Sequence, residues 1–188
     1  MRIVSGKYKG RILKGYDEKT TRPTTDKVKE AVFSMIRPYL NESVCLDLFA
    51  GTGSLGIEAL SNYAHFCYFV EKSKPMKEIL LKNITSINSD NNFEVINSSH
   101  KKALDSFKSS NIKFDVVFLD PPYDKHYIGE CLNKFIELNL LNENAIIVCE
   151  FDSEEFDNIN FEILKEKKYG NIQIKVLKKK WELLFYLK

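Results

Sequence analysis

Two short segments of the chain carry residues that can do chemistry together. The first is Asp47-Leu-Phe-Ala-Gly51-Thr-Gly53-Ser-Leu-Gly56, and the second is Asp120-Pro-Pro-Tyr123. The glycines of the first segment let backbone approach a ligand closely, as in a cofactor-binding loop. The second is a proline-stiffened loop that begins with a carboxylate, which suits the binding of a flat amino group. Together they predict the transfer of a small group onto a planar nitrogen.

The glycine spacing by itself fits more than one cofactor. The three glycines satisfy GxGxxG, and Glu71 stands twenty positions beyond the first of them, as in nicotinamide- and flavin-dinucleotide proteins. Asp47 argues against a dinucleotide, because a carboxylate at the end of the preceding strand repels a pyrophosphate but attracts the ammonium of a methionine moiety. The sequence therefore favours S-adenosylmethionine, with Glu71 accepting hydrogen bonds from ribose hydroxyls. Three further residues are expected to line the bend: Phe49, Ala50 and Thr52.

The proline-containing loop has the acceptors that an exocyclic amino group needs. Neither proline has an N–H, so their carbonyls are free to accept. The Asp120 carboxylate and the Pro121 carbonyl would each take one amino hydrogen, which aims the nitrogen lone pair at a sulfonium methyl. Tyr123 would stack on the base, which must be flipped out or already unpaired. The alternative is a plain turn with one capping carboxylate and a core tyrosine.

Short apolar runs alternate with segments of helical character from Val44 onward, a pattern typical of parallel strands joined by crossover helices. Near-continuous apolar runs such as 116–119 and 145–148 indicate strands covered on both faces. The expected strands are 44–48, 66–71, 93–97, 114–119 and 145–150, and the expected helices are 54–62, 75–88, 100–109 and 127–140. The sequence thus predicts an α/β doubly wound sheet.

The two ends of the chain differ from this pattern. Segments 161–168 and 172–179 alternate in polarity around Tyr169-Gly-Asn171, which predicts an antiparallel hairpin at the edge of the sheet. A smaller hairpin is expected over 3–13, followed by a helix that begins near Thr24, Thr25 or Asp26 and ends before Pro38. The apolar tail 181–188 either packs on the sheet edge or prolongs the last strand.

Composition indicates an ordinary globular protein. At 188 residues the chain is expected to form one domain with a full core. No stretch approaches the roughly 18 apolar residues of a membrane span, and the N-terminus lacks the apolar core of a signal peptide, so we expect a cytoplasmic location. The four cysteines show neither CxxC pairing nor a histidine at metal-ligand spacing. They are expected to be core thiols, and no metal site is expected.

Charge is distributed unevenly along the chain. Residues 1–30 hold nine Lys or Arg and four Asp or Glu, although the net charge of the whole chain is only +2. Such a basic segment is suited to contact phosphates, or is simply a solvated face. The candidates for phosphate contact are Lys7, Lys9, Arg11, Arg22, Lys27, Lys29 and, near the proline loop, Lys125. Tyr8 has the flat ring needed to stack on a loosened base.

These motifs resemble those of the class I S-adenosylmethionine-dependent methyltransferases, and the proline loop is similar to that of the amino-methylating subgroup. The N-terminal Gly6-Lys-Tyr-Lys-Gly-Arg-Ile-Leu13 and Arg22-Pro-Thr-Thr-Asp-Lys-Val-Lys-Glu30 resemble the RsmD family of 16S ribosomal RNA guanine-N2 methyltransferases. The resemblance implies a Rossmann-like, mostly parallel seven-stranded sheet over 41–188 and a basic RNA-contacting extension over 1–40. It also implies small-subunit ribosomal RNA as the substrate. We expect a monomer.

Carried onto this sequence, the resemblance assigns roles by position. The catalytic loop comprises Asp120, Pro121, Pro122 and Tyr123. The cofactor residues are Asp47, Phe49, Ala50, Gly51, Thr52, Gly53, Glu71, Lys72, Ser99 and His100, with Arg22, Thr24 and Thr25 closing over the methionine end. Ser99-His100 departs from the family, which commonly has an acidic or amide residue before a small one there. His100 is expected to be exposed or to cap a helix.

Three other functions fit part of the pattern. A DNA adenine or cytosine methyltransferase shares the Asp-Pro-Pro-Tyr loop, but the chain has no room for a sizeable region that reads bases. A nucleotide-binding module without catalysis would not depend on Asp120. An NAD oxidoreductase would be stabilised by a different cofactor.

Overall fold

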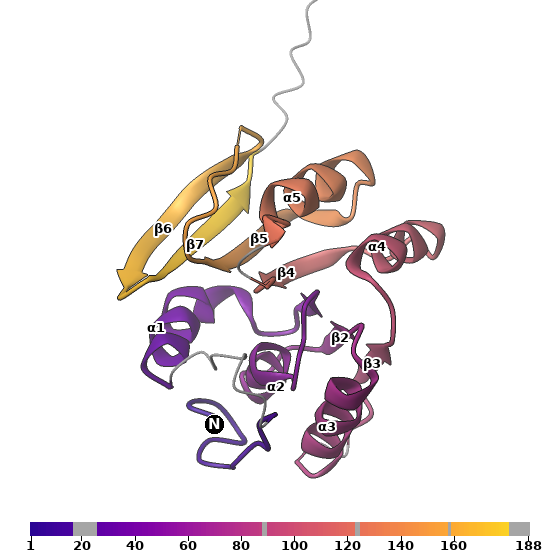
Figure 1. Ribbon diagram of the computed structural model, residues 1–188, viewed down its shortest axis with the longest axis vertical. Coiled ribbons are helices and arrows are strands. Elements are labelled where there is room, and N and C mark those ends of the chain that lie inside the picture. Colours follow the sequence, from indigo (N-terminus) through magenta and orange to yellow (C-terminus); the bar gives the residue numbers. More distant parts are fainter. Residues whose placement is uncertain (17–25, 88–89, 123–124, 158, 181–188) are drawn as a thin grey trace, which may run out of the picture.

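The protein is an α/β structure built on one seven-stranded sheet (Figure 1). The computed structural model describes residues 1–16, 26–87, 90–122, 125–157 and 159–180. The helices are α1 (Asp26–Ile36), the 3-10 helix η1 (Arg37–Tyr39), α2 (Ser54–Ser61), α3 (Lys74–Thr85), α4 (His100–Ser109) and α5 (Ile128–Glu137). The strands are β1 (Val44–Asp47), β2 (Phe66–Val70), β3 (Phe93–Ile96), β4 (Phe114–Leu119), β5 (Leu141–Phe151), β6 (Phe161–Tyr169) and β7 (Ile172–Lys179).

The order of the strands is β3-β2-β1-β4-β5-β7-β6. Strands β1 to β5 are parallel, whereas β7 pairs antiparallel with both β5 and β6. The predicted doubly wound sheet with an antiparallel C-terminal hairpin is therefore confirmed. The strand order reverses between β1 and β4, and ligands of open α/β sheets bind at such a switch point, beyond the carboxyl ends of the strands.

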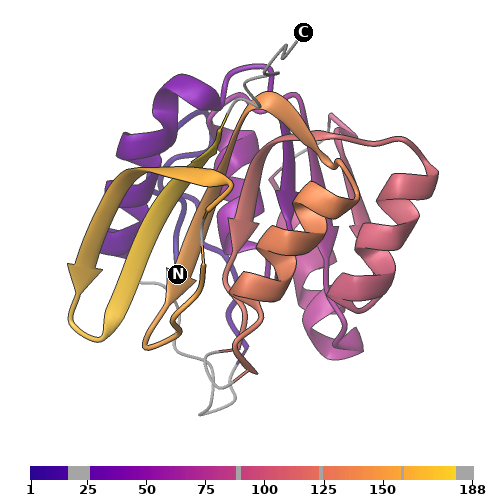
Figure 2. The same cartoon turned by 90° about the horizontal axis from the view of Figure 1, so that it is seen from above.

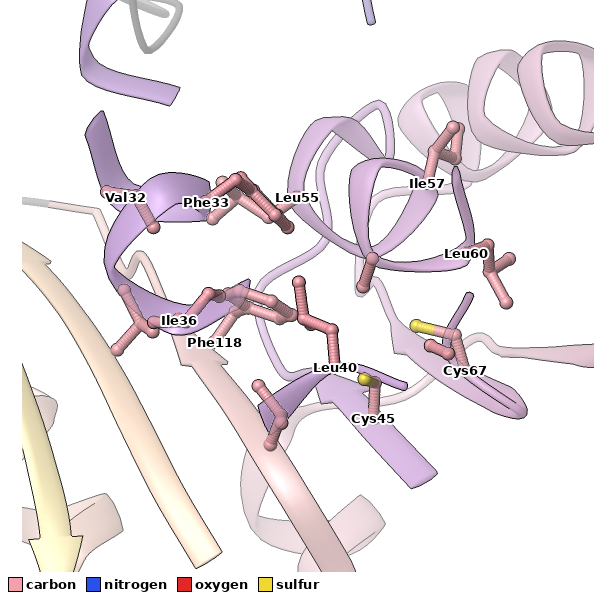
Figure 3. Close-up of a cluster of buried hydrophobic side chains, with 14 of the residues drawn as sticks. Val32, Phe33, Ile36, Leu40, Cys45, Leu55, Ile57, Leu60, Cys67 and Phe118 are labelled. Carbon is pink, nitrogen blue, oxygen red and sulfur yellow. The ribbon is translucent and has the colours of Figure 1, made fainter. Parts of the chain in front are cut away.

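Two hydrophobic clusters cover the two faces of the sheet. Helices α1, α2 and α3 pack on one face and α4 and α5 on the other (Figure 1). Figure 3 shows Phe33 and Ile36 of α1 beside Phe118 of β4, and the rings of Phe33 and Phe118 stack with centroids 5.7 Å apart. The neighbouring Val117 faces the other cluster. Burial on both faces explains the unbroken apolar runs of the central strands.

Element ends differ from the prediction by a few residues. Strand β5 begins at Leu141 rather than at 145, because Leu141 pairs with Phe114 before an irregularity in the β4–β5 register. Helix α5 is shorter than 127–140: Tyr127 precedes its first turn, and Asn139 beyond its end has a positive φ of 53°. The predicted N-terminal hairpin is present around an antiparallel bridge between Arg2 and Ile12.

The cysteines are core residues, as predicted. All four thiols are free and buried. Burial raises the pKa of Cys45 and of Cys131 to about 12, which keeps both as unreactive thiols. Within the described ranges, no three His, Cys, Asp or Glu side chains gather to hold a metal ion, and no helix has the length and apolar character for a membrane crossing.

Candidate active site

The turn between β1 and α2 is built on glycine. Gly51 and Gly53 have φ values of +54° and +90°, in the left-handed region that favours this residue. A Cβ on Gly53 would lie 2.2 Å from Leu80 Cδ1, whereas a Cβ on Gly51 would meet open space. The bend is therefore packed against the protein on one side and open on the other.

Gly56 serves close packing rather than the turn. A Cβ there would lie 2.3 Å from the ring of Phe69 on β2. Helix α2 can thus sit directly against the sheet, which directs its N-terminus at the space above the carboxyl ends of the strands. This agrees with the role of the third glycine in dinucleotide-type turns.

Glu71 links the glycine turn to the loop after β2. It follows β2, and its carboxylate accepts hydrogen bonds from Gly51 N at 2.7 Å and from Ser73 N at 2.6 Å. Partial burial raises the pKa of Glu71 despite these bonds. The structure therefore brings Glu71 to the glycine turn, twenty residues earlier in the chain.

Asp47 has a backbone partner that the sequence analysis did not predict. The residue is only 2% exposed, and its Oδ2 accepts a hydrogen bond from Gly56 N at 2.9 Å. Burial raises the pKa of Asp47 to about 7, and the charge of Glu71 adds to the effect. The hydrogen bond thus ties the end of β1 to the first turn of α2.

The proline loop lies beside this turn. Strands β1 and β4 are parallel neighbours with Asp47 opposite Phe118, so Asp120 follows the adjacent strand end. Burial raises the pKa of Asp120 well above its usual range, and the charges of Glu150 and then Asp47 raise it further. Pro121 is buried and Pro122 is exposed. The carboxylate and the glycine turn therefore share one end of the sheet.

Comparison with known proteins agrees with this arrangement. A family model described as "Conserved hypothetical protein 95" matches residues 1–178. The chain is 38% identical over 181 residues to the ribosomal RNA small subunit methyltransferase D of Haemophilus influenzae, covering 94% of this chain and 92% of the relative. The chain belongs to the RsmD family.

Solved structures place the RsmD-family chain among proteins of the same fold. It superposes on the Escherichia coli protein yhhF with a TM-score of 0.83 at 28% identity, covering 96% of this chain and 98% of that one. A more distant structure, SMU.776 complexed with SAH, has a TM-score of 0.65 at 14% identity and covers 78% of this chain and 49% of that one. The second likeness concerns the fold alone.

Three aromatic rings gather near the glycine turn of this RsmD-family member. Phe49 lies 5.2 Å from the His100 ring and 6.1 Å from the Tyr127 ring, and the latter two are 4.6 Å apart, all between centroids. They come from the segments after β1, β3 and β4. Tyr127 was missed by the sequence analysis, since its only signal was a position just before α5. The three rings pack against one another beside the glycine turn.

The expectation that His100 is exposed or caps a helix is wrong. It is the first residue of α4, but Ser99 is the cap, its hydroxyl accepting from Lys102 N at 3.4 Å. The His100 side chain is only 10% exposed, because it packs in the aromatic group rather than reaching into solvent. Burial lowers its pKa, and Nε2 has no hydrogen-bond partner, lying 3.7 Å from Glu130 Oε1.

Lys72 lies exposed just beyond Glu71. The amide of Asn97 donates to the carbonyls of Glu71 at 2.7 Å and Lys72 at 3.0 Å, which ties the ends of β2 and β3 together. Asn97 was also missed, because a lone asparagine after a strand has no distinctive spacing.

The basic candidates at the N-terminus have different surroundings. Lys9 and Lys27 are exposed. Lys7 Nζ binds the Asp90 carboxylate at 2.9 Å, which raises the pKa of Lys7, and lies 4.9 Å from the Tyr8 ring centroid. The guanidinium of Arg11 lies 5.6 Å from the same centroid. Tyr8 is half-buried, with both cations over its ring.

The prediction that Lys29 contacts phosphates is wrong. It is fully buried, and its ammonium donates to Glu58 Oε2 at 3.0 Å and to the carbonyl of Arg2 at 2.7 Å. Its charge therefore holds the N-terminal segment to α2. Among the other predicted site residues, Arg22, Thr24, Thr25 and Tyr123 lie outside the described residues, as does the tail 181–188.

Proposed function

We propose that this chain methylates the exocyclic N2 amino group of a guanine in 16S ribosomal RNA, with S-adenosylmethionine as methyl donor. The observation that carries the proposal is the pairing of β1 with β4, which puts the glycine turn and Asp120 at neighbouring strand ends. Family membership supports it, since the Haemophilus influenzae relative is named as a small-subunit ribosomal RNA methyltransferase.

The residues at the glycine turn fit the cofactor. Open space at Gly51 leaves room for a ligand against the backbone. With a pKa of about 7, Asp47 is partly ionised at neutral pH, and a bound ammonium would favour its ionised form. Glu71 keeps acceptor capacity for ribose hydroxyls beyond the two backbone bonds it makes. The nearly parallel rings of Phe49 and Tyr127, with His100 tilted against both, offer aromatic contacts for a purine. When bound, the cofactor supplies a methyl group activated by its sulfonium.

Asp120 and Pro121 would bind and orient the amino group of the substrate. The carboxylate and the Pro121 carbonyl each accept one amino hydrogen, which fixes the orientation of the nitrogen lone pair. Alignment of this kind reaches effective molarities of about 10⁵ M or more, so no covalent intermediate is required. The nearby negative charge of Asp120 also offsets the positive charge that develops on nitrogen, and its oxygen takes the released proton.

The substrate is proposed to be presented by a basic surface. Lys7, Lys9, Arg11, Lys27 and Lys125 are exposed and suited to contact phosphates. We place these contacts in an extension over 1–40 and a catalytic core over 41–188 within one methyltransferase domain. The target amino group is inaccessible in a paired stack, so the base must be unpaired or flipped. A cytoplasmic monomer acting on a small-subunit particle completes the proposal.

Nucleoside analysis tests the proposal directly. The protein is incubated with S-adenosylmethionine carrying a labelled methyl group and with small ribosomal subunits, or their RNA, that lack the modification. We expect label in N2-methylguanosine. Label found only in adenine or cytosine of added DNA would instead support the DNA-methyltransferase alternative, and transfer to neither would contradict catalysis.

Glu150 offers a test of the Asp120 carboxylate through pH. Asp120 accepts hydrogens as the anion, so activity falls as the pH drops through its pKa. Glu150→Gln removes a charge that raises this pKa, and we expect the acidic limb of the kcat/KM profile to move to lower pH. Glu154→Gln is the matched control, because Glu154 is also buried but bonds Gly129 N instead. An acidic limb shared by both variants and the wild type would contradict the assignment.

A further inference from the structure

Strand β6 forms one edge of the sheet and carries three exposed lysines, Lys165, Lys167 and Lys168. It is antiparallel to β7, which is antiparallel to β5, so β6 runs in the same direction as the five parallel strands. The carboxyl end of β6 therefore lies on the same side as the carboxyl ends of the parallel strands, where Asp120 follows β4. Figure 2 shows the turn between β6 and β7 on the same side of the sheet as the end of β4.

The pairing register places Lys167 and Lys168 level with the proline loop. Lys165 is level with Phe118, near the end of β4. Lys167 pairs with Ile174, which pairs with Glu150 of β5. Glu150 follows Cys149, the partner of Leu119, and is therefore level with Asp120. Three strand spacings separate β4 from β6, about 14 Å in all. Lys167 and Lys168 thus lie beside the reacting centre, and Lys165 lies two residues before Lys167 on the same strand.

The charges of these lysines are not used within the described part of the chain. No ion pair is found there for any of the three. Glu166, the acid between them, pairs instead with Lys175 at 3.3 Å. Lys175 is itself held over the rings of Phe151 and Phe156, at 5.4 and 5.1 Å from their centroids. The outer charges of β6 therefore remain available to an anion.

Lysine on an edge strand also prevents edge-to-edge aggregation. That role predicts protection along the most apolar part of the edge. In β6 the amino-terminal half contains Ile163, which is 42% exposed, and has no lysine. Lys165 is the central residue of the strand, and Lys167 and Lys168 lie in the half that leads to the active site. Their position follows the site rather than the exposed apolar surface.

We propose that Lys165, Lys167 and Lys168 bind backbone phosphates of the RNA that flanks the target base. This inference rests on the proposed function and adds a second contact surface to it, on the β5 side of the proline loop. The N-terminal segment packs with α1, α2 and α3 and would hold the RNA elsewhere. Two separate phosphate contacts would fix the direction in which the substrate crosses the strand ends.

The test compares two triple variants of the full chain. One carries Lys165→Gln, Lys167→Gln and Lys168→Gln. The control carries Lys82→Gln, Lys108→Gln and Lys113→Gln. Lys82 and Lys108 lie in the last turns of α3 and α4, and Lys113 precedes β4, so all three lie toward the amino ends of the parallel strands, away from the site. Methyl transfer to unmodified small ribosomal subunits is measured as a function of salt for both variants and the wild type.

We expect the β6 variant to raise KM for the subunit about tenfold, with kcat within twofold and with a weaker salt dependence. Three lost contacts to single-stranded RNA lower the slope of log affinity against log salt by about two. The control should behave as the wild type. A triple Lys→Arg variant keeps the charges and should restore KM, which separates a phosphate contact from a folding defect.

Equal KM and salt slope for the β6 variant and the control would overturn the inference, and increased aggregation of the β6 variant alone would then assign the lysines to edge protection. That outcome leaves the proposed function intact, since the wild type still methylates. Absence of transfer by the wild type itself would overturn the proposed function, and the inference with it.

Discussion

Asp120→Asn is expected to lower kcat for methyl transfer at least about 10²-fold without unfolding the protein. The amide oxygen still accepts one hydrogen, but the amide nitrogen is a donor and the side chain carries no negative charge. The variant therefore loses both the alignment of the amino group and the electrostatic compensation at nitrogen. Transfer of label into small-subunit RNA under saturating substrate measures the effect.

Stability and cofactor binding separate this loss from misfolding. The pKa of Asp120 is raised by burial, so ionising it in the folded protein costs stability as pH rises above the usual carboxyl range. The amide removes that cost, and Tm of the variant should equal or exceed that of the wild type at neutral pH. Binding of S-adenosylhomocysteine, followed by calorimetry, should be retained.

Asp105→Asn on the exposed side of α4 is the matched control and should keep full activity. Full activity of Asp120→Asn as well would remove the proline loop from the chemistry. Methyl transfer would then depend on residues other than Asp120.

The sheet could be predicted from local signals, and so could the placement of the glycine turn next to the proline loop. A glycine pattern after one apolar run and a proline loop after another both lie at carboxyl ends of strands. In a doubly wound sheet these ends share one edge. The position of Glu71 at the end of the next strand followed from the same reasoning, but its hydrogen bond from Gly51 did not. The bond from Gly56 to Asp47 did not, since it depends on how deeply α2 packs against β2.

Contacts between distant segments account for most of what was missed. Phe49, His100 and Tyr127 come from three different loops, and no spacing in the sequence connects them. The burial of His100 is a property of that group and not of its own helix. An assignment based on one segment at a time therefore gave it an exposed or helix-capping position.

Lys29 was misassigned although the sequence carried a signal against it. Val32, Phe33 and Ile36 stand three, four and seven positions beyond it, so all four residues lie on one face of α1. A lysine on the apolar face of a helix is either paired or excluded from the core. Counting its charge within a basic run concealed that geometry.

The buried pair of Lys29 and Glu58 yields the second large effect. Lys29→Met should lower the free energy of unfolding by about 3–5 kcal/mol, since it leaves an uncompensated carboxylate in the core. Glu58 also accepts hydrogen bonds from Val4 N, Ser5 N and the Ser5 hydroxyl, so the N-terminal segment shares the loss. Urea denaturation at neutral pH measures the change.

The double variant Lys29→Met/Glu58→Gln distinguishes an unpaired charge from a packing defect. Glutamine keeps an acceptor for Val4 N and Ser5 N but carries no charge, so the double variant should be more stable than Lys29→Met alone. A double variant less stable than the single one would show that Glu58 acts through packing and hydrogen bonds instead.

The pair also anchors the segment that carries Lys7 and Lys9. Lys29→Met should therefore raise KM for the small subunit under conditions where the core remains folded, and the double variant should restore KM in part.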